Sequence, residues 1–236
     1  EGTSSFLTAM ISTIPIFIDR DPLEFMRWLG RLSFVGCAIA AYFATRACIA
    51  DSSGRFLGLC AALATASSAS LAFHSQTGLE TLLYAFLLAL SLTLYFRRFA
   101  ALPGSPSSLW ASTMGMASIT RPEGFAFFFL LFALSLWRRR ERKLRSAGRD
   151  LLFFAAVFGP VLCFRLGYFG AWLPNSVLAK SGTVIHLQNL HIEGLLRALG
   201  FGGAEPQYGY LTAEAGAVLL TCCTALMKST RFAGMV

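Results

Sequence analysis

The chain has 236 residues, of which 56% are hydrophobic and only 14% charged, and its mean hydropathy is +0.61. Soluble domains carry roughly a quarter of charged residues, so this composition excludes an ordinary soluble protein and indicates an integral membrane protein. The formal net charge of +8 is first a topology signal in such a chain, and we expect no nucleic-acid partner.

Apolar segments close to the length of a membrane span recur along the chain. The first, 6–18, contains Pro15 and is followed by charged residues, which favours a position along the interface over a crossing. Further spans are expected at 31–50, 56–73, 81–96, 151–168 and 212–227. Arg46 and Arg165 lie within them.

The apolar run 109–137 is interrupted by Arg121-Pro122-Glu123 and has two interpretations. A single helix would place Arg121 near the bilayer centre, with Arg97-Arg98 and the basic run 138–149 on opposite sides. A hairpin of two half-length arms, 109–119 and 124–136, keeps both basic loops on the cytoplasmic side, where cationic loops are retained. We therefore expect a hairpin, with Pro122 and Gly124 in its turn.

These segments predict an all-α fold, a polytopic transmembrane helical bundle of about seven membrane-entering segments, multi-pass in the cytoplasmic (inner) membrane. Residues 1–30 are expected to be an external or interfacial juxtamembrane segment, and 31–169 the transmembrane bundle. Residues 170–211 are expected to form an external loop with a short amphipathic helix, and 212–236 a final transmembrane helix and truncated end. Because the chain begins at Glu1 without a methionine, we expect an internal fragment of a longer protein.

None of the six cysteines belongs to a C-x-x-C motif or to a Cys/His cluster with zinc spacing. The sequence therefore gives no reason to expect a metal site or another cofactor.

Under this topology three polar clusters gather on the external side, at 74–81, 120–124 and 168–175. The candidate site residues that they contain, together with a lysine just beyond, are His74, Glu80, Arg121, Glu123, Asn175 and Lys180. A charged side chain within the hydrocarbon costs about 2.5–3.5 kcal/mol, and an arginine fork recognises phosphate or carboxylate in a bidentate way. Arg121 is therefore the leading candidate.

Structural roles stay open for the same residues. Arg121 can pair with Glu123 or Glu80 and only pin helix ends, and Glu80 can be a solvated carboxylate that complements a helix dipole. His74 can be an interfacial histidine, and Lys180 can extend toward a lipid headgroup without a specific role.

The combination "TGLET", "TRPEG" and "YFGAWLPNSVLAK", in this order, resembles polytopic bacterial glycosyltransferases of the GT-C type. It is most similar to the terminal arabinofuranosyltransferases and related mannosyl or arabinosyl transferases. The resemblance implies a membrane enzyme that moves a sugar from a polyprenyl-phosphate donor to a cell-envelope glycan or lipid acceptor on the external face, surrounded by membrane lipids.

Residue by residue, the resemblance implies donor-phosphate contacts at Arg121 and Lys180. It implies sugar or acceptor contacts at Glu80, Glu123 and Asn175, and we add His74 as a candidate for the same role. In such enzymes a carboxylate of the first external loop is the general base, and we expect it upstream of Glu1. A second hypothesis is a non-enzymatic polytopic protein, either a transporter or an accessory or motor-control component, that uses the same external cavity.

Overall fold

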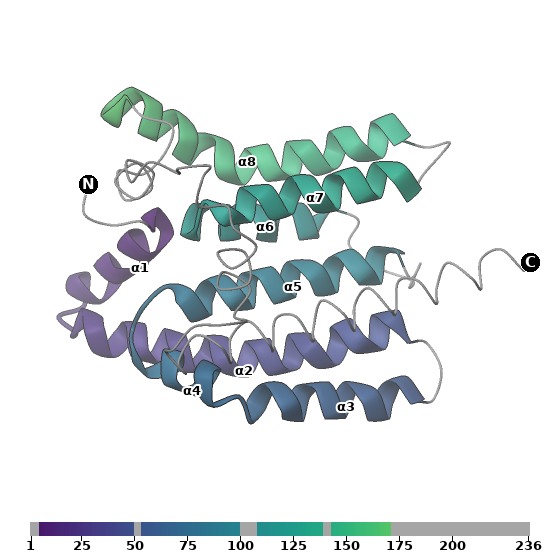
Figure 1. Cartoon of the computed structure of the whole chain (residues 1–236). Helices are drawn as coiled ribbons and strands as arrows, with labels where there is room; N and C mark the ends of the chain where they lie inside the picture. Colours follow the sequence, from purple (N-terminus) through teal and green to yellow (C-terminus); the bar gives the residue numbers. More distant parts are fainter. Residues whose placement is uncertain (1–4, 50–52, 100–107, 139–142, 171–236) are drawn as a thin grey trace, which may run out of the picture.

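The computed structural model describes residues 5–49, 53–99, 108–138 and 143–170. Within these ranges all secondary structure is helical (Figure 1): α1 (Phe6–Phe17), α2 (Pro22–Cys48), α3 (Ser53–Ala66), α4 (Ala69–Gln76), α5 (Thr81–Phe99), α6 (Leu109–Thr120), α7 (Glu123–Arg138) and α8 (Lys143–Phe169). Three helices, α2, α5 and α8, are long and apolar enough to cross a membrane, and α3 with α4 adds a fourth crossing if the bent pair is one span. The described residues thus have the all-α, multi-pass character that the composition predicts.

From α2 onward the helices run in alternating directions, with α3 and α4 following each other in one direction, so most connections gather at two ends of the bundle (Figure 1). The start of α5 and the turn between α6 and α7 lie at one end, which we call the hairpin end. The last turn of α5, the start of α6 and the start of α8 lie at the other, which we call the basic end. Helix α6 is central and packs against α1, α5, α7 and α8.

The run 109–137 folds as a hairpin, as expected, with its turn at Arg121 and Pro122. A residue before proline is disfavoured in the helical conformation, and Arg121 has φ −144° and ψ 137°. The amide of Gly124 donates to the Arg121 carbonyl at 3.1 Å. A Cβ on Gly124 would lie 2.7 Å from the backbone nitrogen of Ser118, so the absence of a side chain lets α7 begin against α6.

The expected span 56–73 is instead two helices, α3 and α4, bent by 53° at a short break. The Ser68 side chain caps α4 by accepting a hydrogen bond from the Leu71 amide at 3.3 Å. The Ser67 hydroxyl donates to the Ala64 carbonyl at 3.1 Å. Serine hydroxyls compete with the helical backbone for its hydrogen bonds and favour helix ends, which is why the chain turns here.

Two helices extend beyond the apolar segments that predict them. Helix α2 begins at Pro22, well before the expected start at 31, because the Asp21 side chain accepts a hydrogen bond from its first turn at 2.9 Å and proline suits the first helical position. Helix α8 begins at Lys143, inside the basic run, because lysine and arginine are good helix formers. The hydrophobic pattern therefore marks the spans but not the helix ends.

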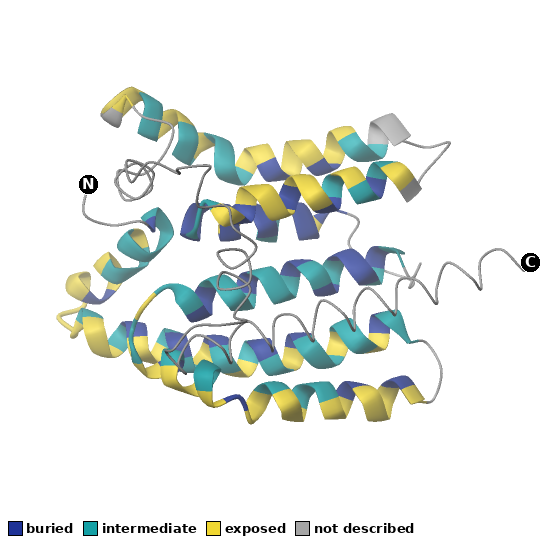
Figure 2. Ribbon diagram, viewed as in Figure 1, coloured by how far each residue is buried: buried dark blue, intermediate teal, exposed yellow. Residues whose placement is uncertain are grey.

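An aromatic cluster between α5, α6, α7 and α8 forms the centre of the core. Trp110 is fully buried, with its ring 5.3 Å from Tyr95 and 5.5 Å from Phe128, and Phe128 stacks on Phe154 at 3.8 Å. Aromatic pairs of this kind contribute about 0.5–1.5 kcal/mol each beyond their buried area. By contrast, exposed residues run along α3 and α8 (Figure 2), where many large apolar side chains face outward, as expected for surfaces in contact with lipid.

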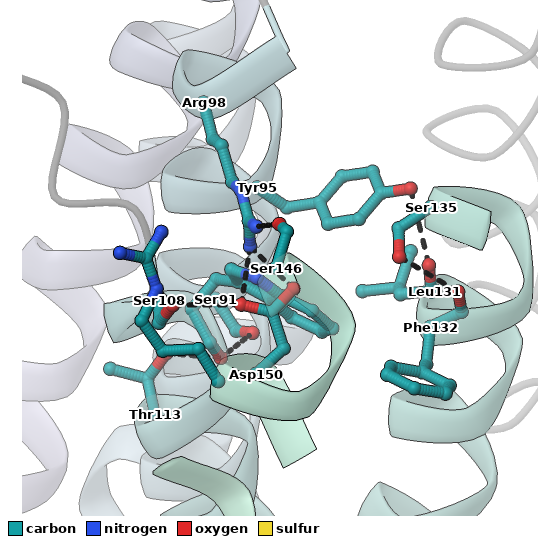
Figure 3. A network of polar contacts seen from close by, with 12 residues as sticks. Ser91, Tyr95, Arg98, Ser108, Thr113, Leu131, Phe132, Ser135, Ser146 and Asp150 are labelled. Carbon is teal, nitrogen blue, oxygen red and sulfur yellow. Dashed lines mark hydrogen bonds and ion pairs between the residues drawn. The ribbon is translucent and has the colours of Figure 1, made fainter. Parts of the chain in front are cut away.

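A buried ionic network fixes three helices at the basic end (Figure 3). The Arg98 guanidinium lies 2.6 Å from both carboxylate oxygens of Asp150 and donates to the Ser146 hydroxyl at 2.6 Å. The Ser108 hydroxyl donates to Asp150 at 2.8 Å and accepts from Arg149 at 3.0 Å. The side chains of Arg98 and Asp150 are only 4% and 1% exposed. The role of Arg98 is therefore structural: it links α5 to α8.

Candidate functional site

Arg121 is the cation of the candidate site at the hairpin end. It follows the last residue of α6 and has an extended backbone at the tip of the hairpin. The guanidinium carbon lies 5.7 Å from the centre of the Tyr84 ring, within the range of a cation–π interaction, which contributes about 0.5–1 kcal/mol at an exposed position. Tyr84 belongs to the first turns of α5, so the contact ties the hairpin turn to a second helix.

The predicted pairing of Arg121 with Glu123 exists but is weak. A guanidinium nitrogen lies 3.5 Å from a carboxylate oxygen, and the two side chains are 36% and 55% exposed. That separation is at the outer limit of a hydrogen bond, and an exposed pair contributes about 0–1 kcal/mol. Arg121 can therefore exchange Glu123 for an anionic ligand at little cost.

Glu80 lies immediately before α5, in the position that caps its first turn. Its carbonyl accepts a hydrogen bond from the Tyr84 amide at 2.9 Å. Residues four apart share a helix face, so Glu80 lies on the side of α5 that carries Tyr84. Glu80 and Glu123 both stand at helix N-termini, where the helix dipole stabilises a carboxylate.

His74 lies apart from this group, in the last turn of α4. Its Nδ1 is shielded from solvent and has no hydrogen-bond partner among the described residues, and its ring packs edge-on against Phe73 at 5.6 Å. The structure thus places His74 in helix packing at the same end of the bundle, with no hydrogen bond to Arg121 or Glu123 in the described part of the chain.

The two remaining predicted site residues, Asn175 and Lys180, lie outside the described residues. The predictions of an external loop over 170–211 and of a final span at 212–227 also fall there.

Tyr84 is the member of the site that sequence reasoning missed. Its ring lies beneath the Arg121 guanidinium, and its hydroxyl interacts electrostatically with both Glu123 and Arg121. Tyrosines are common in apolar segments, and Tyr84 lies within the leucine-rich segment 81–96. The feature of the sequence that could have indicated a role for Tyr84 is its spacing of four residues from Glu80.

Arg121 and Arg98, each paired with a carboxylate, differ in what they can do chemically. Arg98 is buried and held by both oxygens of Asp150 at 2.6 Å, whereas the guanidinium of Arg121 is partly exposed and lies 3.5 Å from its carboxylate partner. The hairpin end therefore offers an available guanidinium and two carboxylates, with the ring of Tyr84 beneath the guanidinium. Within the described ranges no three His, Cys, Asp or Glu residues gather closely enough to hold a metal ion.

Searches of protein-family models, of curated proteins and of solved structures give no match to this chain.

Proposed function

We propose that the protein is a GT-C-type membrane glycosyltransferase that moves a sugar from a polyprenyl-phosphate donor to an envelope glycan or lipid acceptor at the external face. The observation that carries this proposal is the availability of Arg121, whose ion pair within the described part of the chain is a partly exposed 3.5 Å contact with Glu123. In this proposal the hairpin end faces the exterior, and the bundle has about seven membrane-entering segments.

The chemistry of the site favours a phosphate as the ligand. An arginine fork matches phosphate oxygens in a bidentate way, and the N-termini of α5 and α7, which lie at the same end (Figure 1), add partial positive charge. A phosphate carried by a lipid is favoured over a free one because Phe125 and Phe129 are exposed apolar side chains on the first turns of α7, the helix that begins at the hairpin turn.

In the proposed reaction the bond between the sugar C1 and the phosphate oxygen breaks, and a bond from the acceptor oxygen to C1 forms. The electron pair of the broken bond leaves with the lipid phosphate, whose charge Arg121 stabilises. The acceptor proton passes to a carboxylate base that we do not assign among the described residues. Glu123 orients Arg121, and Glu80 binds sugar hydroxyls.

The test is transfer from a panel of polyprenyl-phosphate sugars by the purified full-length protein. We expect Arg121→Gln to lower turnover by about 10²–10³-fold, the effect of removing one donor that stabilises developing charge, and Arg121→Lys to restore part of it. The control is Arg46→Gln, because Arg46 lies in the last turn of α2, and that end of α2 is at the basic end, opposite the hairpin turn (Figure 1). Wild-type turnover in Arg121→Gln would rule out the phosphate contact. If the wild-type protein transfers sugar from none of the donors in the panel, the proposed transferase activity is wrong.

A second function, transport, is favoured by one observation, the 53° break between α3 and α4. Transporters build substrate sites from discontinuous membrane helices of this kind. In proteoliposomes a transporter would move a lipid-linked sugar across the bilayer without consuming it, and a transferase would consume it only when an acceptor is present.

A further inference from the structure

An exposed tryptophan with two fixed polar neighbours lies where α2 begins, outside the residues of the candidate site. Trp28 is 54% exposed, and the guanidinium carbon of Arg31, one turn later, lies 4.8 Å from the centre of its ring. The Arg31 guanidinium donates two hydrogen bonds, at 3.2 and 2.9 Å, to the side-chain oxygen of Gln76 in α4. We call Trp28, Arg31 and Gln76 the α2–α4 cluster.

The packing of α2 against α4 holds the α2–α4 cluster in place. A Cβ on Gly30 would lie 2.6 Å from the Ser75 carbonyl oxygen, so the two helices approach closely beside Gln76. The Gln76 amide donates to the Ser75 hydroxyl at 3.3 Å. Arg31 is therefore held from two sides, by the amide oxygen and by the cation–π contact with Trp28. A tryptophan that only anchors a span at the membrane interface needs no such partners.

An exposed apolar stripe continues from Trp28 along α2. Its members follow the spacing of one helix face and are between 43% and 66% exposed: Leu32, Val35, Ile39 and Phe43. The residues of α2 that pack against the bundle are Met26, Gly30, Ser33, Cys37 and Ala40. A polar and aromatic cluster at one end of an exposed apolar stripe matches a lipid with a polar headgroup and a long tail.

The α2–α4 cluster lies at the hairpin end. The link between α4 and α5 packs against the first turns of α2, since a Cβ on Gly78 would lie 3.0 Å from Cδ1 of Leu23. Gln76 and Glu80 are four positions apart, so their Cα atoms are separated by at most about 14 Å. A headgroup bound at the cluster can therefore extend toward Glu80.

The charges around the α2–α4 cluster favour a neutral headgroup over an anionic one. Three acidic and three basic residues stand between positions 19 and 31, so their formal charges cancel: Asp19, Asp21, Glu24, Arg20, Arg27 and Arg31. Segments that bind anionic lipids carry a basic excess instead.

The side chains of the cluster have the groups that a sugar needs. An exposed aromatic ring packs on the C–H face of a sugar ring, and N–H groups beside it donate to the hydroxyl oxygens. A guanidinium has five N–H groups and a side-chain amide has two. Within the described residues Arg31 uses two of these and Gln76 one, so both keep donors for a ligand.

We propose that the α2–α4 cluster binds the sugar of a neutral glycolipid whose tail lies along the apolar stripe of α2. Trp28 stacks on the sugar ring, and Arg31 and Gln76 donate hydrogen bonds to its hydroxyl groups. The role of this glycolipid as the acceptor rests on the proposed function, whereas its binding does not require sugar transfer.

The experiment measures saturable photo-cross-linking of neutral glycolipids to the full-length protein in phosphatidylcholine nanodiscs. The probes are diacylglycerols that carry one hexose or pentose with a photoreactive group on the sugar, and peptide mass mapping locates the label. We expect the label in the first turns of α2 and the last turn of α4. Labelling confined to other segments would overturn the proposal.

Two variants of Trp28 and a matched control test the stacking contact. Trp28→Ala should weaken the apparent affinity about 2–10-fold, the size of an aromatic contact, and Trp28→Phe should weaken it less because a ring remains. The control is Trp137→Ala, since Trp137 is 81% exposed but lies in the last turn of α7, at the basic end (Figure 1), and its affinity should stay at the wild-type value. Equal affinity of Trp28→Ala and wild type, or equal loss in Trp137→Ala, would contradict the site.

Competitors separate a sugar site from a general lipid surface. Unlabelled glycolipid should displace the probe, and phosphatidylglycerol or diacylglycerol without a sugar should not at the same concentration. Displacement by either of these would overturn the proposal in favour of a general lipid contact.

A transfer assay distinguishes this proposal from the proposed function. Labelling that depends on Trp28, without transfer from any donor, would remove the proposed function and leave the glycolipid site standing. Transfer by the wild type, with the acceptor KM and the labelling both unchanged in Trp28→Ala, would do the reverse.

Discussion

The buried pair at the basic end allows a quantitative prediction. Asp150→Asn keeps the shape of the side chain and removes its charge, which leaves the Arg98 guanidinium, 4% exposed, without a counter-charge. Two unit charges about 4 Å apart interact by roughly 4 kcal/mol at an effective dielectric constant of about 20. Removal of one partner from a buried pair costs about 3–5 kcal/mol. We therefore expect a loss of about 3–5 kcal/mol of stability.

The assay is thermal unfolding of the full-length protein in detergent, where that loss corresponds to a fall in Tm of roughly 6–20 °C for a chain of this size. The control is Asp19→Asn, because Asp19 is exposed with φ 53°, a backbone conformation that asparagine adopts readily. Its Tm should stay unchanged or rise slightly.

A double variant tests the physical reason for the expected loss. Arg98→Leu with Asp150→Leu removes both charges, and replacement of a whole buried pair by apolar residues is often neutral. We expect it to be more stable than Asp150→Asn. A fall of less than about 2 °C for Asp150→Asn, or a double variant as unstable as the sum of its single changes, would show that the network does not hold α5, α6 and α8 together.

Two further predictions concern the hairpin turn and the packing of the cysteines. Gly124→Ala should destabilise the hairpin and lower the Tm, because the new Cβ would lie 2.7 Å from the Ser118 backbone nitrogen. The control is Gly159→Ala, whose new Cβ would meet nothing within 4 Å and which should leave the Tm unchanged. A maleimide added to the folded protein in detergent should modify Cys60 and Cys163, which are exposed, before Cys37, which is buried. Peptide mass mapping at successive times measures the order of modification, and equal rates for Cys37 and Cys60 would contradict the packing of α2.

The sequence by itself determined the features that depend on composition and on neighbouring residues. The membrane class follows from apolar content, and the break in the run 109–137 follows from Pro122, which forces the preceding Arg121 out of the helix. The same local reasoning could have placed the bend between α3 and α4, since Ser67 and Ser68 carry its signal, but the apolar length of 56–73 concealed it.

Only the tertiary structure decided how the charged residues divide between structure and function. From the sequence, Arg97-Arg98 and the run 138–149 are interpreted as basic loops that set the topology. In the fold, the pairing of Arg98 with Asp150, 52 positions apart, depends on the register of α5 against α8, which side-chain packing around Trp110 fixes. The position of Tyr84 beneath Arg121 likewise depends on how α5 packs against the hairpin, because contacts between helices are set by packing across the whole core and not by the spacing of residues along one segment.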